Sequence, residues 1–182
     1  SDPTNPLEPE LTETRQFIDL CSELGIQLVN LTAGSPYYNP HIQRPAAYPP
    51  SDGYQPAHDP LIDVARQMKV VRSLMKTKPD NVALVGSGYS YLQEFLPQVA
   101  QAAIREGWTD FVGIGRVVLS YPDILVDAME RGELTPKFIC RTFSDCTTGP
   151  RNGLISGCFP LDPYYTAKEE NRKIKELKKN LK

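Results

Sequence analysis

Short apolar runs alternate with amphipathic stretches along this 182-residue chain. Three runs rich in aliphatic and β-branched residues predict strands, because each is short and bounded by turn residues. The predicted strands cover residues 26–32, 82–85 and 111–114. Four stretches with apolar residues at three- and four-residue spacing predict helices at 12–24, 60–76, 96–105 and 122–131. This alternation of strands and helices is typical of parallel βαβ units, so we predict an α/β fold.

Each predicted helix is expected to bury one apolar face. Thr12 is the expected N-cap of the first helix, and Asp59 followed by Pro60 should begin the second. Pro97 is incompatible with a regular helix through the preceding residues, so a turn is expected at 91–94. The expected inward residues are Phe17, Ile18, Cys21 and Leu24 in the first helix, Leu61, Val64, Ala65, Met68, Val71 and Leu74 in the second, and Ile124, Leu125, Ala128 and Met129 in the last.

Two glycine loops follow consecutive predicted strands. Gly86, Ser87 and Gly88 come after the second strand, and Gly115 and Arg116 come after the third. The carboxyl ends of parallel strands are where α/β proteins bind ligands, and glycine lets backbone N–H groups approach an anion. The two-pronged guanidinium of an arginine also suits phosphate. The pair of loops therefore predicts a phosphate site, with the alternative that the glycines only turn the chain.

Neither loop matches a nucleotide-binding fingerprint. Gly86-x-Gly88 is followed by the segment from Tyr89 to Leu92 rather than by a third glycine. A Gly-Lys-Ser/Thr sequence, which would indicate a P-loop, does not occur in the chain. The loops thus favour a phosphate group without indicating a dinucleotide.

The segment from Ala33 to Pro60 is rich in proline and tyrosine and has no periodicity. Loops of this length are uncommon inside a compact domain and are usually functional or disordered. One interpretation is a lid over the glycine loops that contacts a planar ligand. The other is an ordered surface cover in which the tyrosines pack on neighbouring residues. The main candidates for ligand contact are Tyr37 and Tyr38, and the further candidates are Tyr48, His41 and His58.

The runs VGSGYS and DFVGIGRVVLSYPD resemble the last two βα units of the old yellow enzyme family, in its dienoyl-CoA reductase-like branch. The resemblance implies a C-terminal portion of a (β/α)8 TIM barrel, with about three parallel strands and their flanking helices over residues 1–165. It implies an FMN-dependent NAD(P)H:flavin oxidoreductase of the ene-reductase type, with FMN and NAD(P)H as partners. The residues expected around the flavin phosphate are Gly86, Ser87, Gly88, Gly115 and Arg116.

The parts of the family barrel that carry its chemistry precede the matched region. A complete barrel typically needs about 250 residues, and the strands that serve the flavin ring and the proton donor have no counterpart in this chain. No catalytic residue can be assigned, and whether the chain alone is an enzyme stays open. The alternatives are a non-catalytic phosphate- or nucleotide-binding α/β domain, or another barrel enzyme that binds FMN or phosphate.

Three cysteines resemble part of the family's iron–sulfur motif. Cys140, Cys146 and Cys158 match the first, third and fourth ligand positions, whereas Phe143 stands at the second. Because such clusters are normally held by four thiolates, we expect no cluster and no metal here. One alternative is a cluster with an outside ligand such as Asp145, and another is a Zn site of the three Cys plus an Asp or a His from elsewhere.

Charge and hydropathy argue against two classes of partner, nucleic acids and membranes. The 20 basic and 22 acidic residues are interspersed, which predicts no nucleic-acid partner. The sequence has no apolar run near 18 residues and no signal-like start, so we expect a cytoplasmic protein without a membrane partner. Residues 166–182 are predicted to form a basic helix with Ile174, Leu177 and Leu181 as a thin apolar stripe. Open edge strands of a partial barrel favour a homo-oligomer.

Overall fold

Three short parallel strands form the centre of the computed structural model, which describes residues 8–179. The strands are β1 (Leu28–Leu31), β2 (Ala83–Gly86) and β3 (Phe111–Val112), in the order β1-β2-β3. Val29 pairs with Leu84, and Val85 pairs with Phe111. The predicted α/β class with a three-stranded parallel sheet is therefore confirmed. The first and third strands are shorter than expected.

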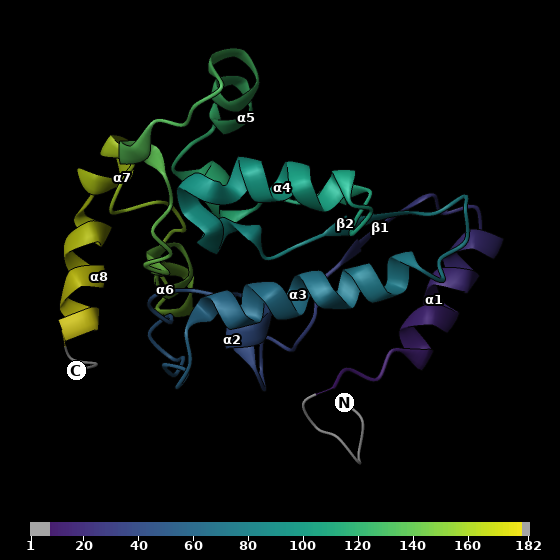
Figure 1. The fold of residues 1–182 in the computed structure, drawn as a ribbon. Coiled ribbons are helices and arrows are strands. Elements are labelled where there is room, and N and C mark those ends of the chain that lie inside the picture. Colours follow the sequence, from purple (N-terminus) through teal and green to yellow (C-terminus); the bar gives the residue numbers. More distant parts are fainter. Residues whose placement is uncertain (1–7, 180–182) are drawn as a thin grey trace.

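Helices lie at about three of the positions that periodicity predicts, namely 12–24, 60–76 and 96–105 (Figure 1). The helix predicted at 122–131 is divided into a short α-helix and a π turn, and three further short helices, α2, α6 and α7, were not predicted. The α-helices are α1 (Thr12–Glu23), α2 (Pro40–Gln43), α3 (Pro60–Met75), α4 (Leu96–Arg105), α5 (Ile124–Val126), α6 (Asp145–Arg151), α7 (Pro163–Thr166) and α8 (Glu169–Lys179). Tight 3-10 turns cover Tyr89–Phe95, Arg116–Leu119 and Pro136–Phe138, and a π turn covers Asp127–Arg131.

Local sequence signals account for two of the helix starts. The Asp59 carboxylate accepts a 2.8 Å hydrogen bond from the Leu61 amide, so it caps α3 as expected. Pro97 lies in the first turn of α4, where its missing N–H costs nothing. The segment before it is a 3-10 turn with a kink at Gln93, which agrees with the predicted interruption. Thr12 is not an N-cap, because it is already helical and Leu11 holds the cap position.

The hydrophobic core lies between the sheet and the helices on one of its faces. Val29 and Leu84 alternate with exposed or half-buried neighbours along their strands and pack against α1 and α3. A second cluster fills the space around α4 and the turn after β3; it contains Tyr89, Leu96, Val117, Tyr121, Ile124 and Ile139. On the opposite face, Leu28 is 59% exposed and Phe111 is 55% exposed. The sheet is therefore covered well on one face only.

Buried polar residues change the inward faces of two predicted helices. In α3, Leu61 and Ala65 are exposed, contrary to the prediction, whereas Asp63 and Gln67 are fully buried. In the helical segment after residue 122, Leu125 and Met129 are exposed instead of inward. Asp63 and Gln67 in α3, and the buried Asp127 after α5, each have hydrogen-bond partners that replace water. Apolar periodicity does not reveal such partners, and this is why the predicted faces were wrong.

The first helix also buries less than predicted. Ile18 and Cys21 are buried in the core, but Phe17 and Leu24 are exposed. Phe17 lies within α1 and Leu24 directly follows it, and the sheet is only three strands wide. A narrow sheet cannot cover the whole apolar stripe of α1.

The C-terminal helix packs on the body of the protein through a narrow contact. Ile174 of α8 is fully buried, and α8 contacts α6 and α7. Its Lys178 ammonium is ion-paired with Asp145 and donates a 2.9 Å hydrogen bond to the Phe143 carbonyl. The predicted apolar stripe is confirmed at Ile174; Leu181 lies outside the described residues.

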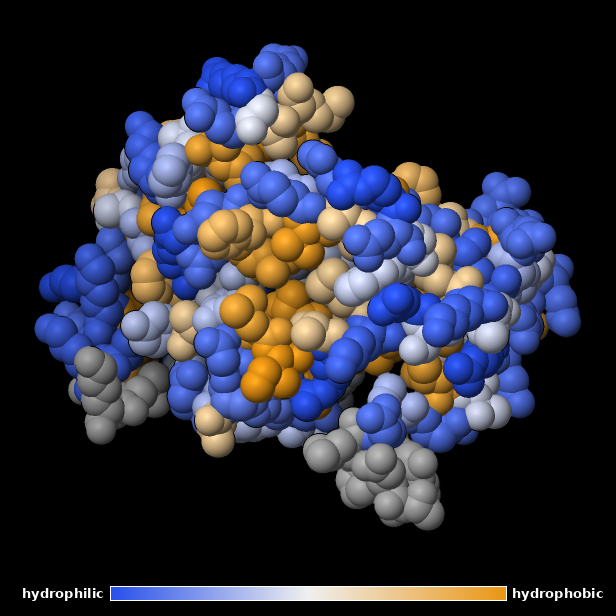
Figure 2. Space-filling view, in the orientation of Figure 1, coloured by the Kyte–Doolittle hydropathy of each residue, from blue (hydrophilic) through white to orange (hydrophobic). Residues whose placement is uncertain are grey.

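The molecular surface combines a central apolar area with polar rims. Figure 2 shows apolar residues gathered over the region between α3 and α4, and hydrophilic residues at the outer margins. The exposed large hydrophobic residues include Leu61 and Ile62 in the first turn of α3, and Phe95 directly before α4. None of the helices within residues 8–179 is both long enough and apolar enough to cross a membrane.

Candidate anion-binding site

The two glycine loops lie next to each other at the carboxyl edge of the sheet. The Gly113 amide donates a 2.7 Å hydrogen bond to the Gly86 carbonyl, which continues the β2–β3 pairing beyond the strands. The hydroxyl of the buried Thr109 accepts a 3.0 Å hydrogen bond from the Gly86 amide. Parallel pairing therefore brings together Gly86 and the segment leading to Gly115, as the sequence predicts.

Backbone donors in these loops are available to an external acceptor. Within the described chain, the amides of Ser87, Gly88 and Gly115 donate to no other group. The Ser87 hydroxyl donates a 2.7 Å hydrogen bond to the Asn30 side chain, which links the loop to the end of β1. Free N–H groups near the carboxyl ends of parallel strands are a common feature of anion sites.

The reason for glycine differs between the predicted positions. At Gly86 a Cβ would lie 3.2 Å from the Tyr89 hydroxyl, so tight packing accounts for the absence of a side chain. Gly88 has a φ of +91°, which L-residues rarely adopt. Gly115 is different, because a Cβ there would meet no atom within 4 Å and its φ is not positive. Of the twelve glycines in the chain, only Gly115 has neither feature.

The side chain of Arg116 extends from the second glycine loop to the proline-rich loop. Its guanidinium donates a 2.7 Å hydrogen bond to the carbonyl oxygen of Pro45. Burial lowers the pKa of the Arg116 guanidinium, and the nearby positive charge of Arg44 acts in the same direction. The residue remains a cation, but one that loses much of its hydration in the fold.

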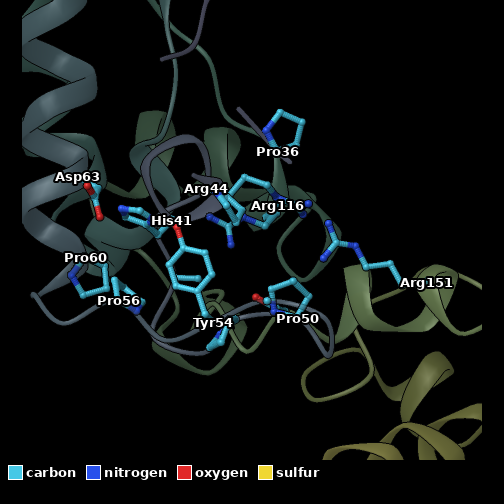
Figure 3. Close-up of a pocket in the computed structure, with 15 residues that line it drawn as sticks. Pro36, His41, Arg44, Pro50, Tyr54, Pro56, Pro60, Asp63, Arg116 and Arg151 are labelled. Atoms are coloured by element: carbon cyan, nitrogen blue, oxygen red, sulfur yellow. Dashed lines mark hydrogen bonds between the residues drawn. The ribbon is translucent and has the colours of Figure 1, made fainter. Parts of the chain in front are cut away.

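Arg116 lines a recess together with two arginines that the sequence analysis did not identify. Figure 3 shows the guanidinium groups of Arg44, Arg116 and Arg151 facing a shared space, with the Tyr54 ring beside it. The recess is small, with a cavity volume of about 30 Å³, and it opens to solvent. Arg44 and Arg151 come from the proline-rich loop and from α6, so only the folded chain brings them to Arg116.

Two of these three arginines lack an acidic partner. Arg151 is ion-paired with Asp52, whereas Arg44 donates to the Thr147 hydroxyl. No carboxylate of residues 8–179 lies within ion-pair distance of Arg44 or Arg116. Two neighbouring guanidinium groups without a counter-charge favour a bound anion.

The proline-rich loop is fixed to the body by a few buried polar contacts. The Gln67 amide is fully buried and bonds to both backbone groups of Ala33 and to the Ile42 carbonyl. Further along, Tyr48 stacks on Phe143 at 5.6 Å between ring centroids. These contacts agree with an ordered cover, while Arg44 and Tyr54 of the same loop line the recess.

The predicted ligand-contact tyrosines of this loop lie away from the recess. Tyr37 is 88% exposed and Tyr38 is 85% exposed. The described recesses are lined by neither of them. Of the other candidates, His41 lies beside Tyr54 in the recess, and burial lowers the pKa of its imidazole.

The three cysteines of the predicted motif line a second, smaller recess. Cys140, Cys146 and Cys158 surround it together with Phe143, and all three are free thiols. Burial raises the pKa of the Cys140 thiol and raises that of Cys158 to about 11. Asp145, the possible substitute ligand, is instead paired with Lys178. Arg116 lies at the boundary between the two recesses.

Comparison with known proteins adds no relative to this picture. No family model, curated protein or solved structure matches the chain.

Proposed function

We propose that this chain provides the phosphate-binding part of an FMN site, as the C-terminal portion of an old yellow enzyme-like TIM barrel. In this proposal, FMN would take hydride from NAD(P)H and pass it to an electron-poor alkene or a similar acceptor. The chain's own contribution is to bind the phosphate end of the cofactor. The ring system and the proton donor would be served by strands that this chain does not contain.

The single observation that carries the proposal is the open space at Gly115. A side chain at this position would contact no other atom of the protein, so packing does not explain the glycine. The Gly115 amide also has no acceptor within the described residues. A phosphate oxygen seated against the backbone there would use both features. The free amides of Ser87 and Gly88 lie on the adjacent loop, so they would add donors from a second strand end.

Electrostatics supports anion binding next to the glycine loops, although Arg116 lines the arginine recess and residues 86–88 and Gly115 do not. Arg116 follows Gly115 directly and has Arg44 as a neighbour, with no carboxylate on either guanidinium within the part of the chain that the structure describes. A phosphate dianion would relieve the repulsion between the two cations and form charge-assisted hydrogen bonds. Because Arg116 is partly buried and its guanidinium is desolvated, such bonds are worth more than at an open surface.

A pair of matched ligands tests this proposal. FMN and riboflavin share the flavin ring system and differ in the phosphate, so flavin fluorescence on titration with protein isolates the phosphate contribution. We expect FMN to bind at least ~10-fold more tightly than riboflavin, since one charge-assisted contact is worth about 1.5–3 kcal/mol. Arg116→Gln should abolish this preference.

Gly115→Ala provides the control for local structure. A Cβ at Gly115 meets no protein atom, so the thermal midpoint should change little, whereas FMN affinity should fall because the methyl group occupies the phosphate position. Equal affinity of the native chain for FMN and riboflavin would contradict the proposal.

A second function is favoured by the shape of the arginine recess. Three guanidinium groups facing a small space could select any compact anion, as in a non-catalytic phosphate- or nucleotide-binding domain. Inorganic phosphate and ADP distinguish the two functions. If either competes with FMN at equal affinity, the flavin ring contributes nothing and the simpler anion-binding function holds.

A further inference from the structure

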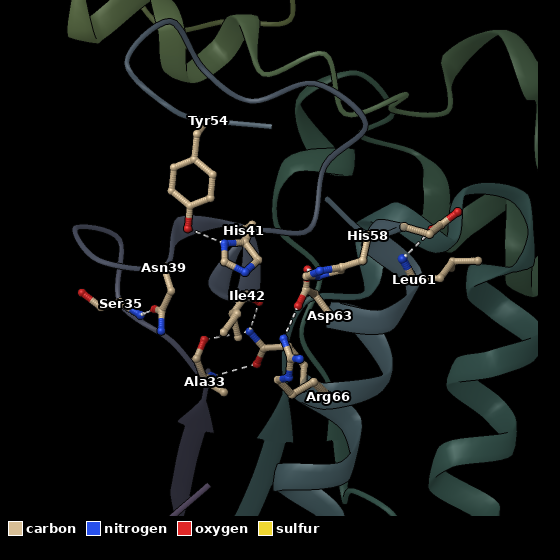
Figure 4. A network of polar contacts seen from close by, with 12 residues as sticks. Ala33, Ser35, Asn39, His41, Ile42, Tyr54, His58, Leu61, Asp63 and Arg66 are labelled. Carbon is tan, nitrogen blue, oxygen red and sulfur yellow. Dashed lines mark hydrogen bonds and ion pairs between the residues drawn. The ribbon is translucent and has the colours of Figure 1, made fainter. Parts of the chain in front are cut away.

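The only two histidines of the chain come together beside the N-terminal end of α3. Figure 4 shows His41, from α2, and His58, from the loop before α3, next to Asp63. The two imidazole rings are 5.5 Å apart between centroids and lie edge to face. Together with the Asp63 carboxylate, their ligand atoms all lie within 4.8 Å of one another. Across residues 8–179 no other group of three or more such residues meets this spacing.

The Asp63 carboxylate is fully buried and is held in place from two sides. The Arg66 guanidinium pairs with its Oδ1 atom, and Nε2 of His58 lies 2.8 Å from its Oδ2 atom. A buried carboxylate is costly unless it is paired, so its orientation toward the histidines is fixed by the fold. The Arg66 contact occupies one oxygen and leaves the other facing His58.

The imidazole of His41 is also oriented by a neighbour. Its Nδ1 atom lies 2.6 Å from the Tyr54 hydroxyl. A hydrogen bond at one ring nitrogen sets the tautomer and leaves the other nitrogen available, which is the usual arrangement of metal-binding histidines. Tyr54 and Arg66 would therefore act as the outer partners of a three-residue ligand set.

We propose that His41, His58 and Asp63 bind one divalent transition-metal ion, with Zn²⁺ as the best match. Two imidazole nitrogens and one carboxylate oxygen are ligands that zinc favours, and three protein ligands leave one coordination position open. Metal–ligand distances of about 2.0–2.2 Å require the three ligand atoms to close in on a common centre. The half-buried imidazoles can rotate to do so, whereas the buried carboxylate stays in place.

The simpler alternative is a hydrogen-bonded cluster without metal. In that case His58, Asp63 and Arg66 only hold the end of the proline-rich loop against α3. The two explanations differ in one respect, because only the metal site requires His41. In the structure His41 contacts Tyr54 and His58 but makes no hydrogen bond to Asp63.

Titration of the untagged full chain with Co²⁺ tests the proposal. We expect one equivalent to bind, with visible absorption of a nitrogen- and oxygen-ligated ion, and Zn²⁺ to displace it. His41→Gln and His58→Gln should each weaken binding at least ~10-fold, because each removes one ligand. Lys69→Ala, on the exposed side of α3, is the matched control and should bind as the native chain does.

Two further readouts keep the test decisive if a variant folds poorly. The native chain has two histidines, so both imidazole signals in its proton NMR spectrum should shift together on addition of one equivalent of Zn²⁺. A sulfur-to-cobalt charge-transfer band that disappears in Cys140→Ser, Cys146→Ser and Cys158→Ser would instead assign the metal to the thiols. That result, unchanged imidazole signals, or no saturable binding would overturn the proposal.

Discussion

The guanidinium of Arg116 donates a 2.7 Å hydrogen bond to the backbone carbonyl of Pro45, 71 positions earlier in the chain. This contact joins the second glycine loop to the proline-rich loop. It leaves other N–H groups of the guanidinium to face the recess that Arg44 also lines. A residue expected to contact phosphate thus also orders the loop that covers it.

Gln67 should be a major determinant of the order of the proline-rich loop. Gln67→Ala removes three hydrogen bonds to Ala33 and Ile42 from a fully buried position. We expect the free energy of unfolding to fall by about 2–4 kcal/mol, because buried backbone groups lose their partners. Urea denaturation measures this, with Lys69→Ala on the same helix as the control. A loss no larger than that of Lys69→Ala would contradict the assigned role.

The Thr109 hydroxyl should stabilise the first glycine loop. It accepts from the Gly86 amide at 3.0 Å and lies within donor distance of the carbonyls of Leu84 and Phe111. Thr109→Val keeps the shape but leaves the buried Gly86 amide without this acceptor, so we expect a loss of about 1–3 kcal/mol in thermal or urea unfolding. Thr109→Ser retains the hydroxyl and should lose less. Equal losses in the two variants would assign the effect to packing instead.

Cys158 should react slowly with alkylating reagents in the folded protein. Burial raises the pKa of its thiol to about 11, against an ordinary value of 9.0. At pH 8 roughly one thiol in a thousand is then ionised, and only the thiolate reacts. We expect modification ~100-fold slower than in the urea-unfolded chain, as followed by mass spectrometry of the peptide that contains Cys158. Equal rates in the folded and unfolded chains would show that burial does not protect it.

The same shift in the pKa of Cys158 gives a sign for pH-dependent stability. Because the folded pKa is higher than the unfolded one, the folded state binds more protons between them. The contribution to stability is complete below pH 9 and is lost as the pH rises towards about 11. The free energy of unfolding of the native chain should therefore fall over this interval more than that of Cys158→Ser.

The open face of the sheet should mediate self-association. Leu28 and Phe111 are largely exposed there, and both edge strands are unpaired within the described residues. Leu28→Lys combined with Phe111→Lys should lower the apparent mass in analytical ultracentrifugation, since charges oppose burial of this face. Met129→Lys is the control at an exposed apolar residue outside the sheet. If the native chain is monomeric at high concentration, this prediction is wrong.

The sequence by itself determined the elements whose signals are local. Periodicity placed the three strands and the main helices, the Asp59-Pro60 pair placed the start of α3, and Pro97 placed the interruption before α4. Parallel strand order then put the segments after β2 and β3 at one edge. These features follow from backbone geometry and from the burial of apolar surface, which neighbouring residues encode.

Only the tertiary structure decided which polar groups are buried and which meet. On the inward face of α3 lie Asp63 and Gln67, where Leu61 and Ala65 were predicted. The hydrogen-bond partners His58 of Asp63 and Ile42 of Gln67 lie on a loop with no periodicity of its own. Arg44 reached Arg116 in the same way, through the path of that loop. A buried polar group is stable only beside a partner of matching geometry. Such partners come from distant parts of the chain, and the fold alone brings them together.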